Sequence, residues 1–252
     1  MFGGIRAVLE ALDVDVWPTL DQLNALSEAR ALRNASGAPI CFVAPTMVGS
    51  AMAYESQIAA SGEIPTRENL HDLLNALQWL SFPRMKGTIN AEHVKRLQEG
   101  GEAEAKSRSR ERDVLTMFDE SGVIVASADR TLLDLLQTFQ WRALFVDRRA
   151  DVTANMRFYL VGHGLMEKAL APFIGITGKA VLLNVEADEI GATSMLDGAI
   201  AQWLAHPAHL ASAQNLAPLP LLGIPGWDAR NEDAAFYDNA TYFRPGRLPK
   251  PA

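Results

Sequence analysis

The chain has 252 residues, of which 48% are hydrophobic and 21% are charged, a composition typical of a folded protein and not of a disordered one. Its single cysteine excludes an internal disulfide framework and a multi-cysteine zinc site, and no apolar run approaches the ~20 residues of a membrane span. The net charge of −7 disfavours extended contact with nucleic acid. We therefore expect a cytoplasmic protein with one domain over residues 1–252.

The first half of the chain predicts mainly helices. Thr19 and Gln22 have the spacing of a capping box before an apolar helical stripe. A short buried strand is expected over residues 39–44, because β-prone residues there are stopped by Pro45. Further helices are expected over residues 54–60, 66–80 and 90–98.

The second half mixes helices and strands. Residues 99–111, rich in charge and glycine, are expected to form a mobile surface loop. Two β-prone runs, 114–118 and 123–127, flank the acidic segment Asp119–Gly122 and predict a β-hairpin. Helices are expected over 131–141, 158–170 and 195–204, strands over 144–146 and 179–185, and an ordered, proline-rich arm over 217–252. Because helices and strands do not alternate regularly, the expected fold class is α+β, helix-rich with a small antiparallel sheet.

The predicted helix over 66–80 has two unusual faces. Leucines form one apolar stripe, while the opposite side carries His71, Asp72, Asn75 and Trp79 in place of ordinary solvent-facing residues. A tryptophan on that side implies that it is covered, either by protein or by a ligand. The alternative to a functional site is a buried network in which these polar groups bond neighbouring backbone.

Other polar residues could join them. Asn90 and His93 are spaced i, i+3 on one expected helix. His163 and Glu167 are spaced i, i+4, so they can share a ligand or simply bond each other. Asp119 and Glu120 fall in the expected hairpin turn, where acidic residues usually serve turn geometry.

The sequence resembles the bacterial family called domain of unknown function 3025. The matching stretches are Tyr54-Glu55, residues 64–72 with 75–77 and Trp79, Phe82-Pro83 with Lys86, Asn90 and His93, residues 112–122, Gly162-His163, Glu167-Lys168, residues 177–180 and much of 222–245. Gly164 departs from the alanine expected there. The resemblance implies one structural unit and places the polar residues above in the family's pattern, but it brings no mechanism.

The chemistry of these residues favours a metal-dependent hydrolase acting on an anionic, in particular a phosphorylated, substrate. Such an enzyme needs imidazole and carboxylate ligands that converge on a divalent ion with one open position. The expected catalytic groups are His71, Asp72, His93 and Glu167, and the expected metal ligands are His71, Asp72, His93 and His163. The expected substrate-binding residues are Arg67, Asn75, Trp79, Lys86, Asn90, Arg112 and Lys168.

The alternative is a binding protein without catalytic activity. In that interpretation Arg67, Lys86, Arg112 and Lys168 form a cationic pocket for a phosphorylated metabolite or an RNA segment, with residues 99–111 as its lid. A P-loop is excluded because Thr177-Gly178-Lys179 lacks the leading glycine and precedes a strand. His206 and His209, which follow a predicted helix end, are interpreted as structural.

Overall fold

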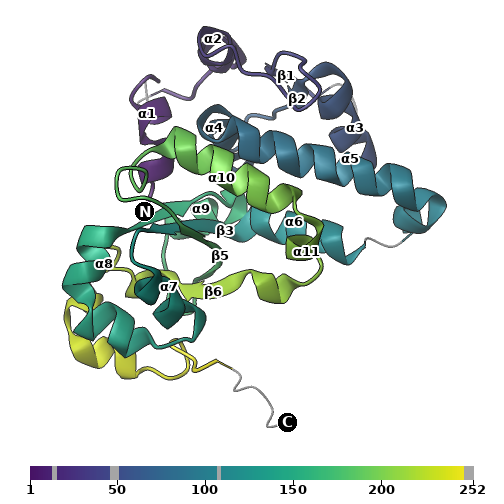
Figure 1. Cartoon of the computed structure of the whole chain (residues 1–252). Coiled ribbons are helices and arrows are strands. Elements are labelled where there is room, and N and C mark those ends of the chain that lie inside the picture. Colours follow the sequence, from purple (N-terminus) through teal and green to yellow (C-terminus); the bar gives the residue numbers. More distant parts are fainter. Residues whose placement is uncertain (13–15, 46–50, 107–108, 247–252) are drawn as a thin grey trace.

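The computed structural model describes residues 1–12, 16–45, 51–106 and 109–246. It confirms the α+β fold class, with helices packed around a small central sheet (Figure 1). No helix in these described ranges is long and apolar enough to cross a membrane.

The central sheet has four strands in the order β4-β3-β5-β6. Their bounds are β3 Gly122–Ser127, β4 Met156–Leu160, β5 Thr177–Asn184 and β6 Ala217–Pro220. β4 and β6 pair antiparallel with their neighbours, but β3 and β5 run parallel, with Val123 opposite Ala180. The sheet is therefore mixed and not purely antiparallel as expected, and the β3–β5 crossover contains α7, α8, β4 and α9.

Helices surround this sheet. Their bounds are α1 Arg6–Leu9, α2 Leu20–Ala29, α3 Ala51–Ser61, α4 Leu70–Ser81, α5 Pro83–Lys106, α6 Arg110–Ser121, α7 Arg130–Gln137, α8 Arg149–Asn155, α9 His163–Ala169, α10 Thr193–Ala205 and α11 Pro207–Leu210. The long helices α5 and α10 lie side by side over one face of the sheet (Figure 1).

Alternate residues of β3 face two separate hydrophobic cores. Val123 and Val125 belong to the larger core, which includes residues of α4, α7, α9 and the C-terminal segment. Ile124 and Ala126 belong to the second core, formed with α5, α6 and α10. This period of two is the pattern of a strand buried on both faces, which explains why every residue of β3 is buried.

The N-terminal part forms a small parallel sheet of β1 (Cys41–Val43) and β2 (Glu63–Pro65). The predicted capping box of α2 is present, with Thr19 and Gln22 exchanging bonds of 2.9 and 3.2 Å. β1 and α3 lie where the sequence predicts a strand and a helix, and Gly62 follows α3 with a φ of 76°.

The predicted hairpin around Asp119 is wrong. Residues 110–121 form helix α6, whose side chain cap is Ser109, and only the run after Gly122 is a strand. Val114, Leu115 and Phe118 are all buried on one side of α6, at helical spacing, whereas a hairpin strand would have turned alternate residues outward. Packing of these residues against the sheet therefore outweighs their local preference for a strand.

Three further predictions are wrong. The expected helix over 158–170 is strand β4, then a turn at Gly162, then helix α9. Residues 99–106 of the expected loop continue α5, which begins at Pro83, a residue that suits the first helical turn; residues 107–108 lie outside the described ranges. The expected strand over 144–146 lies in a π-helical turn over 143–147.

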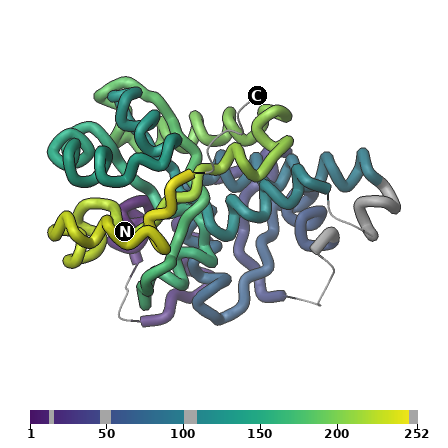
Figure 2. The backbone as a smooth tube through the Cα atoms, turned by 90° about the horizontal axis from the view of Figure 1, so that it is seen from below, coloured from purple at the N-terminus to yellow at the C-terminus, as the bar shows by residue number. Residues whose placement is uncertain are grey.

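The described part of the C-terminal segment, residues 217–246, packs against the rest of the chain. After β6 it continues in short 3-10 helices, and its Tyr237, Tyr242 and Phe243 are buried in the larger core. Figure 2 shows it beside the α7–α8 region, where the Trp141 indole donates to the Arg244 carbonyl at 2.9 Å. Residues 247–252 of the predicted arm lie outside the described ranges.

Candidate metal centre

Helix α4 places His71 in its first turn. The helix begins after Asn69, whose side chain caps it by accepting a hydrogen bond from the Asp72 backbone at 2.9 Å. The Asp72 carboxylate turns back to the preceding chain and accepts three bonds of 2.8–3.0 Å from Arg67. His71, which directly precedes Asp72, has a side chain that is 41% exposed on the side of α4 away from the leucine stripe.

A turn of unusually close backbone contact places His163. The Gly122 carbonyl, at the junction of α6 and β3, accepts bonds from the amides of Val161 and Gly162 at 3.0 and 2.9 Å. A Cβ on Gly162 would lie 2.3 Å from the Gly122 nitrogen, so only glycine permits this approach. The turn therefore holds His163, the first residue of α9, directly against the end of α6.

The last turn of α6 contributes the carboxylates of Asp119 and Glu120. Gly164 leaves the space that the Glu120 side chain occupies, because a Cβ at position 164 would lie 2.3 Å from Oε2 of Glu120. The departure from the expected alanine thus concerns the position of this carboxylate.

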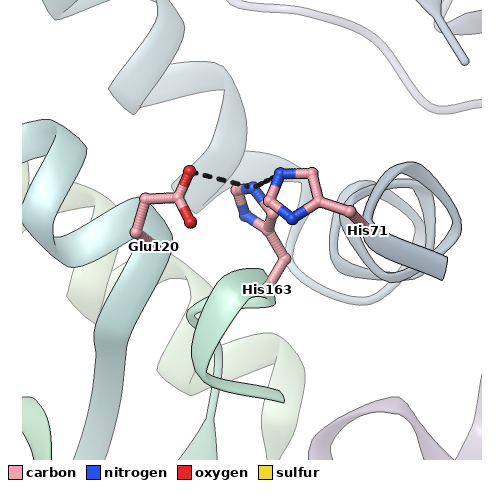
Figure 3. A group of neighbouring side chains, drawn as sticks. All are labelled: His71, Glu120 and His163. Atoms are coloured by element: carbon pink, nitrogen blue, oxygen red, sulfur yellow. Dashed lines mark hydrogen bonds and ion pairs between the residues drawn. The ribbon is translucent and has the colours of Figure 1, made fainter. Parts of the chain in front are cut away.

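Three side chains that are distant in sequence meet at one point, as Figure 3 shows. The Nε2 atoms of His71 and His163 lie 3.1 Å apart, and the His163 Nε2 lies 3.5 Å from Oε1 of Glu120. One potential ligand atom from each of the three residues lies within 4.8 Å of the others. Two donors bound to one ion at 2.0–2.1 Å in tetrahedral geometry are about 3.3 Å apart, so the observed separations fit a divalent metal.

A carboxylate lies behind each histidine. Oε2 of Glu167 is 3.3 Å from Nδ1 of His71, and Oδ2 of Asp119 is 3.9 Å from Nδ1 of His163. The Glu167 carboxylate favours the tautomer of His71 with its proton on Nδ1, which leaves a lone pair on Nε2. Nδ1 of His163 is buried and has no hydrogen-bond partner among the described residues, so the nearby Asp119 contributes its charge only. With a divalent ion between them, both Nε2 atoms and Glu120 would face it as ligands; without one, a proton on Nε2 of His163 can be donated to Glu120 or to His71.

The charges of the two acids are consistent with this arrangement. The hydrogen bond with His163 is the main cause that lowers the pKa of Glu120 below its usual value. Burial alone would raise the pKa of Asp119, but the neighbouring Lys86 ammonium and His163 outweigh it, so that this pKa is also lowered. Both carboxylates are therefore ionised at neutral pH and available to orient or bind a positive group.

A buried polar network continues behind His163. Lys86, only 4% exposed, donates to Asp119 at 2.5 Å and lies 5.7 Å from the ring centre of Trp79. Asn90 donates to the Glu55 side chain at 2.7 Å and to its carbonyl at 2.9 Å. Burial raises the pKa of Glu55 to about 7, against the opposing effect of the Asn90 bond.

The structure brings together His71, His163 and Glu167 from the predicted site, and joins Lys86 to them through Asp119. It separates others. Arg67 and Asp72 bond each other, Asn75 donates to the Tyr54 hydroxyl at 3.1 Å, and Trp79 is buried with 2% exposure. The remaining residues of the predicted set are Asn90, His93 and Arg112, which are buried, and Lys168, which is exposed. Of these, His93 lies near enough to Asp119 to contribute to the lowering of its pKa.

Glu120 and Asp119 are not among the predicted catalytic or metal-binding residues, because the sequence pattern predicts a hairpin turn at their positions. Two sequence signals indicate a helix here. Ser109 is a good N-cap residue, and it caps the Arg112 amide three positions later. Val114, Leu115 and Phe118 then follow at helical spacing. Glu55 lay in a stretch of family resemblance but carried no signal of its partner Asn90, 35 residues away.

Fold and site together define an α+β protein with a cluster of two histidines and one glutamate between the first turn of α4, the end of α6 and the start of α9. The family described as "Protein of unknown function (DUF3025)" matches residues 40–247, and the chain belongs to that family. No curated protein and no solved structure gives a significant match.

Proposed function

We propose that the protein is a metal-dependent hydrolase whose divalent ion is held by His71, His163 and Glu120. The observation that carries this proposal is the convergence of two Nε2 atoms 3.1 Å apart, each histidine having a carboxylate behind its Nδ1. Two histidines and one glutamate are also the ligand set of one class of catalytic zinc sites, which keep a further position open for water or substrate.

The exposure of the cluster supports an open position. The side chain of His163 is 6% exposed, whereas the side chains of His71 and Glu120 are 41% and 44% exposed. Solvent therefore reaches the side of the cluster formed by His71 and Glu120. A divalent ion there would lower the pKa of a bound water to near neutrality and polarise a substrate oxygen.

Each residue of this chain has a separate task in the proposal. Glu167 orients the His71 imidazole, Asp119 provides a negative charge 3.9 Å from Nδ1 of His163, and Lys86 balances the charge of Asp119. An anionic oxygen of the substrate would be held by the ion itself, since the ammonium of Lys86 and the guanidinium of Arg67 are already paired with carboxylates. The same pairing gives less support to a binding protein that uses Arg67 and Lys86 as a cationic pocket.

Elemental analysis of untagged protein, purified without chelator, tests the metal. We expect about one divalent ion per chain in the wild type and after His206→Ala, which changes an exposed histidine outside the cluster. His71→Ala and His163→Ala should each lose the ion while keeping the wild-type circular dichroism spectrum. Wild-type protein that binds no Zn²⁺, Co²⁺ or Mn²⁺ by calorimetry would rule out the proposal.

A substrate screen then tests hydrolysis. Metal-loaded protein is assayed against phosphate monoesters, phosphate diesters and carboxylic esters, with His71→Ala as the blank. Activity that disappears with chelator and returns with the ion supports the hydrolase. A stoichiometric metal without hydrolysis of any of these classes would leave a metal-binding protein and refute the enzymatic part.

A further inference from the structure

A second candidate site lies at the β5–β6 edge of the sheet. A groove of about 1150 Å³ runs between α7 with the C-terminal segment on one flank and α10 with α11 on the other. None of the residues of the histidine–glutamate cluster lines it. Its volume is sufficient for a ligand of the size of a nucleotide.

The charge of the groove is opposite to that of the chain. The charged residues that line it, within the described ranges, are Arg130, Lys179 and Arg244, and no aspartate or glutamate is among them, although the chain carries a net charge of −7. Arg130 pairs with Asp134 at 2.9 Å. Among the residues that the structure describes, Arg244 donates to the backbone carbonyl of Thr241 and pairs with no carboxylate, and Lys179 forms no ion pair. The groove therefore keeps uncompensated positive charge.

Lys179 and an aromatic ring share one flank. In β5, Lys179 lies on the same side of the strand as Val181 and Leu183, which pack in the core under α10. Trp203 of α10 lines the same groove and is only partly buried, with one ring face stacked on His209 at a centroid distance of 4.5 Å. Half-buried Lys179 and the accessible part of Trp203 are thus available together to a ligand.

A peptide strand is not the occupant that the edge favours. Pro218 and Pro220 of β6 stand opposite Lys179 and Thr177 in the register. Neither proline has a backbone N–H, so β6 lacks donors with which an added strand would pair. The groove instead offers cations and an aromatic surface.

We infer that this groove binds a nucleoside phosphate, with the phosphate at Lys179 and the base against Trp203. A lysine ammonium forms charge-assisted hydrogen bonds with phosphate oxygens, and aromatic side chains stack on bases of any sequence. The ligand is either a free nucleotide or the nucleotide at the end of an RNA strand, which present the same chemistry. This inference does not depend on the proposed metal centre.

Calorimetric titration with ADP, adenosine, inorganic phosphate and a ten-residue oligouridylate tests the inference. We expect ADP to bind more tightly than adenosine or phosphate, because only ADP engages both Lys179 and Trp203. Lys179→Met should weaken ADP binding about tenfold or more, as expected for loss of a charged hydrogen bond. Lys95→Met, which changes an exposed lysine of α5 outside the groove, should leave it unchanged.

Two further variants keep the test decisive. Arg244→Gln alters the exposed opposite flank and should weaken binding less than Lys179→Met, and Lys179→Arg should restore most of the affinity. His71→Ala should bind ADP like the wild type. A preference for the oligouridylate over ADP that Lys179→Met abolishes identifies an RNA end, and the reverse preference identifies a free nucleotide.

Several results would overturn the inference. Wild-type protein that binds neither ADP nor the oligouridylate, or binding that Lys179→Met leaves intact, would show that the groove is not this site. Phosphate alone binding as tightly as ADP would remove the base contact, and loss of ADP binding in His71→Ala would place the ligand at the metal centre.

Discussion

Replacement of Gly162 by alanine tests whether close backbone contact positions the histidine cluster. Gly162 has φ −71° and ψ 114°, which alanine adopts without strain, so any cost must come from space and not from backbone conformation. The added Cβ would lie 2.3, 2.4 and 2.6 Å from backbone atoms of Gly122, Ser121 and Glu120, whereas ordinary contacts begin at 3.4 Å. The β4–α9 turn must therefore move away from the end of α6.

The structure gives the size of the effect. Opening three backbone contacts by roughly 1 Å is an overpacking change that costs about 3 kcal/mol, and the smaller entropy of unfolded alanine offsets less than about 1 kcal/mol of it. For a chain of this length we expect the midpoint of thermal unfolding to fall by about 5–10 °C. Because His163 moves with the turn, affinity for Zn²⁺ should fall about tenfold or more.

Urea denaturation and calorimetric Zn²⁺ titration measure the two effects on the same samples. Gly87→Ala is the matched control: it adds a methyl group inside α5, with the nearest atom at 3.6 Å, and should be neutral or stabilise by up to ~1 kcal/mol. A Gly162→Ala protein as stable as the wild type, with unchanged Zn²⁺ affinity, would refute the steric argument.

Three further changes test the surrounding network. Glu55, whose pKa is raised to about 7, binds its proton more tightly in the folded than in the unfolded state. The free energy of unfolding should therefore fall by up to about 3 kcal/mol as the pH rises from about 4.5 to 7. Urea melts at several pH values measure this dependence, which Glu55→Gln should weaken. Lys86→Met leaves the half-buried, ionised Asp119 without its partner, so we expect the free energy of unfolding to fall by about 3 kcal/mol, partly recovered in the double variant with Asp119→Asn. Asn69→Ala removes the cap of α4 and should cost about 1 kcal/mol; an unchanged urea midpoint would show that the bond to the Asp72 amide contributes nothing.

Elements with one dominant local signal were predictable from sequence. The capping box at Thr19 and the apolar strand that became β5 lie where their patterns indicated, and the prediction that Trp79 is covered is confirmed by its burial. These features depend on residues within a few positions of one another, so a short window contains the information.

The segments that form the site were less predictable, because tertiary contacts decide their structure. The run around Phe118 is helical because it covers the sheet, and the strand preference of its residues is weaker than that packing. The sequence pattern places Gly162 inside a helix, but its structural role depends on close contact with Gly122, forty positions earlier. A single sequence does not show that Gly122 and Gly162 are in contact. This contact sets where α9 begins and places His163 beside Glu120.

The charge balance of the cluster argues for a cation at its centre. Among the described residues bonded to or facing the two histidines, the Lys86 ammonium pairs with the Asp119 carboxylate, while the Glu120 and Glu167 carboxylates have no lysine or arginine partner. Two carboxylate charges equal the charge of one divalent ion, and because their side chains are 44% and 46% exposed, solvent also screens them. A free phosphate placed directly on this cluster would meet both carboxylates. Under the proposed function, an anionic substrate would therefore reach the histidines through the ion, and the metal would be required for substrate binding as well as for hydrolysis.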